Sequence, residues 1–393
     1  MTARLGRVGC DPDAVGEAGI IHLDAAGAAR PSPATVEAQA AFLRAEGEHG
    51  AYVAELEAAD TLRAGLEALA ALLGPDLDPD GIAWHHGASA AFATLLGAWP
   101  LPARGGRVGV VPSEYGSNRL VLEACAARAG LDLLDLPVDP AGTVDLDRLD
   151  GFGLDRLDLV VFPQVPSQRG IVQPAAEIGR RCAAAGVPLV VDVAQSLGQV
   201  DTTGIGADAY VGTSRKWLRG PRGAGFVALR AGVADRLGLA APSLHNARRA
   251  ADGGAPEPLP GVARLGVGEA SVAARVGLAR ALVAYAADDP PALRARIAAL
   301  AAHGRRVLDG AGGWQVREEA DSASGIITLR PPPGADPAAT RDRLYRDARI
   351  LTSAIPAARA RDLDGPLLRA SAHAYNDPTD LDRLAAALAA TST

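Results

Sequence analysis

The chain has 393 residues, of which 48% are hydrophobic and 22% charged, with a formal net charge of −7. This length allows two domains with a large core, and the composition is ordinary for a soluble globular protein. The negative net charge disfavours nucleic-acid binding, which needs a basic face, and no apolar run approaches the ~20 residues that span a bilayer.

The N-terminus and the cysteines set the expected compartment. Residues 1–20 carry acids where a signal peptide would have an apolar core, so we expect none. Cys10, Cys125 and Cys182 are odd in number and far apart, which fits neither a disulfide framework nor a set of metal ligands. We therefore expect a cytoplasmic protein without a metal site.

From residue 20 to about 230, strand and helix patterns alternate, which predicts a mostly parallel sheet with helices on both faces. The β-branched and apolar runs that predict strands are 81–84, 108–111, 131–136, 157–162, 189–191, 209–211 and 225–229. The alanine-rich stretches with helical periodicity are 33–45, 52–73, 90–98, 118–129 and 174–185. This part is predicted to be a large α/β domain.

Beyond Leu239 the pattern changes. Residues 240–261 form a long proline-bearing loop, which is either a disordered surface segment or a mobile flap over the site. Helix patterns follow at 269–285, 291–308, 337–347 and 378–390, and strand patterns at 314–316, 326–329 and 350–352. The predicted organisation is an N-terminal segment, 1–20, a large domain, 21–289, and a smaller α+β domain, 290–393.

Lys216 is the only lysine of the chain, and the other 38 of its 39 basic residues are arginine. Arginine stays protonated under protein conditions, whereas a lysine amine can lose its proton and attack a carbonyl. The alternative to a nucleophilic lysine is a surface lysine that has no function and is present by chance. The context favours a nucleophile, because Lys216 follows an apolar run and precedes the turn-rich stretch 220–225, where backbone can approach a ligand closely.

Asp192 lies at the end of a β-branched strand pattern upstream of this lysine. An acid at a strand end and a nucleophilic lysine are what a pyridoxal phosphate (PLP) site requires, because the acid keeps the pyridine nitrogen protonated. Gln195 is placed to hydrogen-bond the ring oxygen. An isolated Asp192 would otherwise be a helix cap or a turn residue.

Further candidates for binding a cofactor or a substrate lie in two loops and in one strand-like stretch. Gly87, Ala88 and Ser89 separate a strand from a helix, where backbone N–H groups can bind an anion. Tyr115 is either a packed surface aromatic or a plate stacked on a cofactor ring. Arg369, in an apolar strand-like stretch, either pairs with a structural acid or clamps a substrate carboxylate.

Taken together, these motifs resemble the class V aminotransferase family of fold-type I PLP enzymes, from Leu23-Asp24 to Tyr375-Asn376. The stretches that carry the resemblance are Glu114-Tyr115-Gly116-Ser117-Asn118, Arg169-Gly170, Ser214-Arg215-Lys216-Trp217-Leu218, Gly268-Glu269 and Ala273-Ala274-Arg275-Val276-Gly277. Within the family they are most similar to carbon–sulfur lyases that act on cysteine sulfoxide conjugates. A cysteine desulfurase is not expected, because 351–368 lacks the cysteine that accepts sulfur.

The resemblance implies a role for each candidate. Lys216 would bond the cofactor covalently and Asp192 would hold the pyridine nitrogen. The other implied cofactor contacts are Gln195, Tyr115, Ala88, Ser89, Thr213 and Arg215, with Ser167 where many relatives have asparagine. Arg369 would hold the substrate α-carboxylate. A homodimer with its site at the interface is also implied.

The substrate side chain is predicted least directly. The lyases of this resemblance act on a conjugate whose leaving group carries a quaternary ammonium and an imidazole. A quaternary ammonium is bound by aromatic faces or acids, and the candidates are Tyr52, Tyr115 and Glu269. His85 or His86 is the candidate partner for the imidazole. Tyr52 is as well explained by packing on a helix face. Two other functions stay open: a class V aminotransferase or epimerase, and a non-catalytic PLP-binding protein, which the intact set of lysine, aspartate and arginine disfavours.

Overall fold

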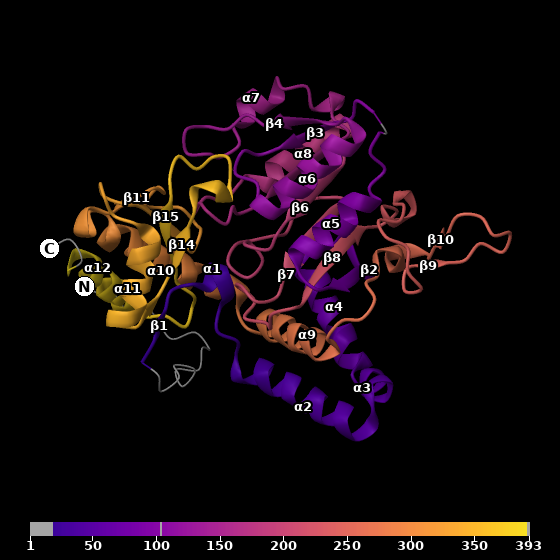
Figure 1. The fold of residues 1–393 in the computed structure, drawn as a ribbon, viewed down its shortest axis with the longest axis horizontal. Helices are drawn as coiled ribbons and strands as arrows, with labels where there is room; N and C mark the ends of the chain where they lie inside the picture. The colour runs from indigo at the N-terminus through magenta and orange to yellow at the C-terminus, as the bar shows by residue number, and fades with distance from the viewer. Residues whose placement is uncertain (1–18, 103, 391–393) are drawn as a thin grey trace.

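The computed structural model describes residues 19–102 and 104–390, so the predicted N-terminal segment, 1–20, lies outside it except for its last two residues. Figure 1 shows a large unit built around one sheet and a smaller unit beside it. The helices are α1 Ala25–Ala28, α2 Pro33–His49, α3 Ala51–Glu57, α4 Ala59–Leu73, α5 Ala88–Ala98, α6 Gly116–Ala129, α7 Leu146–Asp150, α8 Ala175–Ala185, α9 Val272–Ala287, α10 Pro290–Leu308, α11 Pro337–Ala348 and α12 Pro378–Ala390.

The large unit is organised by a seven-stranded sheet in the order β2-β8-β7-β6-β5-β3-β4. Its strands are β2 Leu77–His85, β3 Arg107–Val110, β4 Asp132–Asp135, β5 Leu159–Pro163, β6 Leu189–Asp192, β7 Ala209–Thr213 and β8 Gly225–Arg230. The five strands from β7 to β4 are parallel, which confirms the predicted α/β class. β8 runs antiparallel to both of its neighbours.

The central strands β5, β6 and β7 are buried at every position because helices cover both faces of the sheet. Val160 and Phe162 of β5 pack on one face, in a core that includes residues of α4, α8 and α9. Val161, between them, points to the other face and packs in a core with residues of α5 and α6. This alternation within one buried strand builds the three-layer arrangement that positions the strand ends.

The smaller unit has a four-stranded antiparallel sheet in the order β11-β12-β15-β14. Its strands are β11 Gln315–Val316, β12 Ile326–Arg330, β14 Ser353–Ile355 and β15 Leu367–Ser371. A short N-terminal strand, β1 Ile21–His22, pairs in parallel with β13 Ile350–Leu351. Ile21 and Leu23 pack in one core with residues of α10, β15 and α12. The predicted domain bounds, 21–289 and 290–393, stay predictions.

The structure differs from two local predictions, and it shows which strand of the mostly parallel sheet is antiparallel. The helix predicted over 52–73 is two helices, α3 and α4, which meet at Ala58. Residues 240–261 hold a small hairpin, β9 Ala247–Arg248 with β10 Glu257–Pro258, which projects from the large unit in Figure 1. β8 is antiparallel to β7 because the turn between them holds no helix, and a parallel crossover usually needs one.

The length and the apolar character of the helices bear on whether one of them could cross a membrane. None of those within 19–102 and 104–390 combines the length and the apolar character that crossing a membrane requires.

The packing of α8 gives a test of the large unit. A methyl group added at Gly179 would lie 1.8 Å from the carbonyl oxygen of Ile205, whereas one added at Gly47 of α2 would meet nothing within 4 Å. We expect Gly179→Ala to destabilise the protein by about 1–3 kcal/mol through overpacking. Gly47→Ala should be neutral or stabilising by about 0.5–1 kcal/mol, because alanine favours helix. Chemical unfolding followed by circular dichroism measures both, and equal midpoints would contradict the packing.

Candidate functional site

A cavity of about 240 Å³ opens at the carboxyl ends of β5, β6 and β7, the edge where open α/β sheets bind ligands. Loops after these strands, the start of α5 and the segment before α6 line it. Every residue predicted to contact the cofactor is on its wall: Ala88, Ser89, Tyr115, Ser167, Asp192, Gln195, Thr213, Arg215 and Lys216. The structure therefore brings together nine side chains that the sequence holds up to 128 residues apart (216 − 88).

Lys216 and Asp192 are two buried titratable residues of the cavity wall. Lys216 is 8% exposed and Asp192 4% exposed. Burial lowers the pKa of Lys216 to about 7, against the opposing attraction of Asp192. Burial raises the pKa of Asp192, while the charge of Lys216 lowers it. The amine can thus be neutral near neutral pH, which a nucleophile or a base requires.

The Asp192 carboxylate is fixed by two donors. Asn118 Nδ2 donates to Oδ2 at 2.8 Å, and the Ala194 N–H donates to Oδ1 at 2.8 Å. Asn118 also donates to Glu114 at 3.1 Å, and Glu114 is buried. Neither Asn118 nor Glu114 has a role among the predictions from the sequence, although both belong to the motif Glu114-Tyr115-Gly116-Ser117-Asn118 that carries part of the resemblance.

Elsewhere on the cavity wall, α5 begins at Ala88 with no side chain capping its first turn. The backbone N–H groups there are available to an anion, and they carry the positive end of the helix dipole. Gly87 is packed so closely that a Cβ on the facing Gly225 would lie 2.5 Å from its Cα. Arg215, whose Nη1 donates to Thr213 Oγ1 at 3.3 Å, adds a positive charge on the same wall.

Gln195 is held in place from both sides of its amide. Nε2 donates to the Ala26 carbonyl at 2.9 Å, and Oε1 accepts from Trp217 Nε1 at 2.9 Å. A primary amide has two N–H groups, so Nε2 retains the capacity for a second donation towards the cavity. The predicted contact with a ring oxygen is compatible with these bonds.

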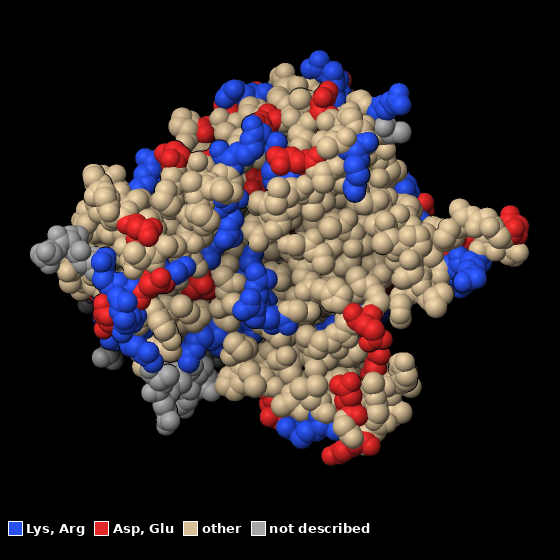
Figure 2. All heavy atoms as spheres, viewed as in Figure 1, with Lys and Arg blue, Asp and Glu red and all other residues tan. Residues whose placement is uncertain are grey.

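Tyr115 forms the boundary between this cavity and a second groove. Lys216 Nζ lies 5.8 Å from the centroid of its ring. The groove, of about 660 Å³, runs between α6 and the segment 356–363 and includes Arg119, Arg359 and Arg361. Figure 2 shows basic side chains in a band between the two units on this face. The segment packs tightly on α6, since a Cβ at Gly116 would lie 2.5 Å from the Arg359 carbonyl oxygen.

Arg369 is buried and bound on several sides. Nη2 donates to Asp24 Oδ1 at 2.9 Å and Nη1 to the Ser167 carbonyl at 2.8 Å, while Nε has no partner among the described residues. Of the two alternatives from the sequence, pairing with an acid is present. Arg369 is not among the residues that line the cavity, and its contact with a substrate carboxylate stays a prediction.

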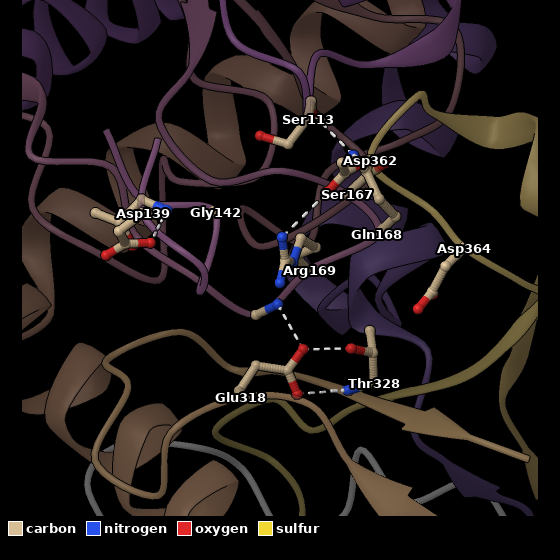
Figure 3. Close-up of polar contacts among 12 residues, drawn as sticks. Ser113, Asp139, Gly142, Ser167, Gln168, Arg169, Glu318, Thr328, Asp362 and Asp364 are labelled. Carbon is tan, nitrogen blue, oxygen red and sulfur yellow. Dashed lines mark hydrogen bonds and ion pairs between the residues drawn. The ribbon is translucent and has the colours of Figure 1, made fainter. Parts of the chain in front are cut away.

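Ser167 connects this arginine to a wider network, part of which is drawn in Figure 3. Ser167 Oγ donates to Gln168, whose Nε2 donates to the Ser113 carbonyl at 2.8 Å and to Asp362 at 3.2 Å. Nearby, Glu318 accepts from the backbone N–H groups of Gly170 and Thr328. These bonds join the loop after β5 to both β12 and the segment 356–363.

Of the residues selected for the substrate side chain, Tyr115 and His86 line the cavity and the others do not. His86 lines it, whereas His85 is buried and bonds the Leu265 carbonyl at 2.9 Å. Tyr52 is 83% exposed on α3. Glu269 is exposed in the loop before α9. Within one chain, Tyr52 and Glu269 are not on the cavity wall, and their roles stay predictions.

The cavity fits PLP on its own chemistry. Its wall offers uncapped backbone donors and Arg215 to a phosphate, and a buried carboxylate, Asp192, to a pyridine nitrogen. The flat face of Tyr115 and the amine of Lys216 lie on the same wall. A phosphate site, an acid and a neutral amine at these three places are the contacts that PLP requires of a protein.

Comparisons with known proteins agree with this geometry. Residues 21–384 match the Aminotransferase class-V family. A probable hercynylcysteine sulfoxide lyase of Mycobacterium tuberculosis (strain CDC 1551 / Oshkosh) is 42% identical over 94% of this chain and 90% of its own length. Isopenicillin N epimerase of Streptomyces clavuligerus is 32% identical over 82% of each.

A solved structure gives the corresponding comparison of folds. The protein C-DES, determined with glycine covalently linked to its PLP cofactor, superposes with a TM-score of 0.82 over 95% of this chain and 97% of its own, at 20% identity. The resemblance predicted from the sequence is thereby confirmed, as are the fold-type I architecture and the cofactor. The chain belongs to the class V aminotransferase family, whose members are PLP-dependent enzymes.

Proposed function

We propose that this protein is a PLP-dependent carbon–sulfur lyase of ergothioneine biosynthesis that cleaves hercynylcysteine sulfoxide. The observation that carries the proposal is the 42% identity with a probable hercynylcysteine sulfoxide lyase over 94% of the chain. The carbon–sulfur bond breaks with its electron pair going to sulfur. The sulfur-bearing trimethylhistidine leaves as a sulfenate, the precursor of ergothioneine, and the three-carbon remainder hydrolyses to pyruvate and ammonia.

The residues of the cavity support this chemistry in separate roles. PLP, when bound, withdraws electrons from the α-carbon of the substrate. Asp192 holds a proton at the pyridine nitrogen, and the start of α5 with Arg215 holds the phosphate. Lys216 Nζ, with its pKa lowered to about 7, accepts the α-proton. Arg369 binds the α-carboxylate, the role that the resemblance to the family implies for it.

The cysteines support a lyase over a desulfurase. A desulfurase needs a mobile thiol near the cavity to accept sulfur, and the segment 356–363 beside Tyr115 carries Arg359 instead. The described cysteines, Cys125 and Cys182, are both buried in the cores of the large unit. Burial raises the pKa of Cys182 to about 12, so its thiol is unreactive.

An epimerase or aminotransferase is the second candidate, favoured by the 32% identity with isopenicillin N epimerase. Removal of the same α-proton by Lys216 begins each of these reactions, so the cofactor site does not separate them. The reactions differ in their next step, because a lyase expels a group from the β-carbon, whereas an epimerase returns the proton.

We also propose that the protein works as a homodimer. Large apolar side chains stand exposed on two neighbouring helices, α2 and α3, and they are Val36, Leu43, Tyr52, Val53 and Leu56. Such a patch is typical of an interface. A partner contact there would explain why Tyr52 is solvent-exposed within one chain, and it gives that residue access to the partner's site.

The lowered pKa of Lys216 predicts selective acylation. In cofactor-free protein, its amine should react with an amine-directed acylating reagent half-maximally near pH 7, because below that pH the amine is protonated and not nucleophilic. An ordinary lysine reaches this point near 10.5. Peptide mass spectrometry separates Lys216 from the N-terminal amine. A midpoint above pH 9 would contradict the buried, neutral amine.

The single lysine allows a direct test of covalent attachment. Borohydride treatment of the holoenzyme should fix the cofactor on Lys216, and Lys216→Arg should remove both the label and turnover, since arginine keeps the charge but is not a nucleophile. Arg346→Lys is the control, because it adds an exposed lysine that should stay unlabelled. Full activity of Lys216→Arg would refute the assignment.

Product analysis tests the reaction and the substrate together. Hercynylcysteine sulfoxide should yield pyruvate and ammonia in equal amounts, and plain S-alkyl cysteine sulfoxides should be turned over at least about tenfold less efficiently, because they lack the trimethylammonium and imidazole contacts. Pyruvate is followed by coupled reduction. Equal or better turnover of alkyl sulfoxides would indicate a general cysteine-conjugate lyase, and inversion of the α-carbon without pyruvate would indicate an epimerase.

A further inference from the structure

A second buried carboxyl lies next to Asp192 and has no part in the proposed chemistry. Glu114, between β3 and α6, is 1% exposed. The amide of Asn118 joins the two acids, since its Nδ2 donates to Glu114 Oε1 at 3.1 Å and to Asp192 Oδ2 at 2.8 Å. An amide nitrogen has two hydrogens, so both are used, and the three side chains form a fixed row.

The surroundings of Glu114 disfavour a negative charge on it. Oε1 also accepts from the Tyr115 N–H at 2.7 Å, but Oε2 has no partner among the described residues. The charged groups that face it are Asp192 and Arg119, and Arg119 is already paired with Glu123 and Asp135. Burial, followed by the charge of Asp192, raises the pKa of Glu114 to about 8.

The charge belongs on only one of these acids. Two adjacent buried carboxylates repel each other, so one of them retains a proton. Asp192 faces Lys216, which favours an ionised Asp192 when its amine is protonated, and in the holoenzyme it would face the protonated pyridine nitrogen that it is proposed to hold. The cation that faces Glu114, Arg119, is shared with Glu123 and Asp135, so the proton is more favourable on Glu114 than on Asp192.

We propose that Glu114 is a positioning residue that stays protonated and, through the shared amide of Asn118, aims the Asp192 carboxylate at the pyridine nitrogen of PLP. This inference rests on the role proposed for Asp192. A neutral Glu114 orients the donor without competing for the pyridine proton. The same carboxyl fixes the backbone of Tyr115, so it connects the acid at the ring nitrogen with the residue at the ring face.

The readout is the protonation of the pyridine nitrogen itself. Holoenzyme is prepared with PLP labelled with ¹⁵N in the ring, and the ¹⁵N chemical shift and the dissociation constant of PLP are measured from pH 6 to 9. The wild type should show a protonated ring nitrogen and a further small shift with its midpoint near pH 8, where Glu114 ionises. Glu114→Gln should keep the protonated nitrogen and lose that step, with PLP affinity changed by less than about threefold, because it is isosteric and neutral.

Removing the link should have a different effect. Glu114→Ala and Asn118→Ala should each weaken PLP binding about tenfold and lower the protonated fraction of the ring nitrogen, because Asp192 loses its orienting donor. Glu123→Gln, on the same helix and in contact with the same Arg119, should match the wild type.

Each contrary result has one meaning. If Glu114→Gln behaves like Glu114→Ala, the residue acts through its charge, and if Glu114→Ala matches the wild type, it does not position Asp192; either overturns the proposal. A wild type without the step near pH 8 overturns the retained proton. Asp192→Asn is measured in parallel: if its ring nitrogen is unchanged, the role proposed for Asp192 fails, independently of Glu114.

Discussion

The site depends on one constraint, which is that an amine and a carboxylate are buried together at the edge of an apolar sheet. Isolated charges in such a place are costly, and the cost falls when the charges are paired and hydrogen-bonded. The charges of Lys216 and Asp192 attract each other. Asn118 and the Ala194 N–H each donate a hydrogen bond to the Asp192 carboxylate. The same burial that makes this arrangement costly brings the amine to a pKa at which it is reactive.

Most of the fold could be predicted because its signals are local. The run 189–191 is β-branched and apolar, and it is a strand buried on both faces. The break at Ala58 could not be predicted, since alanine favours the helix on either side of it and carries no signal for an end. The pairing of β1 with β13 was equally hidden, because it joins residues more than 300 positions apart.

The site was predictable where chemistry restricts the choice of residue. Nothing but lysine serves as the nucleophilic amine, and a chain with a single lysine shows where it is. Partners that only orient others are harder to find. Asn118 and Asp192 are 74 residues apart, and Arg369 and Asp24 are 345 apart. From the sequence alone, each of these acids and amides could have many partners. Only the folded structure shows which residue each of them contacts.

The place of β1 in the smaller unit has a mechanical consequence. Within the described residues, the chain passes from β1 through α1 to the large unit and reaches the smaller sheet after α10, so two stretches of chain connect the two sheets. Two connections resist twisting and sliding, and they leave rotation about the line between them as the motion that strains the backbone least. Gln195, on the cavity wall, bonds the Ala26 carbonyl beside one of these connections, so such a rotation would have to keep or break this bond.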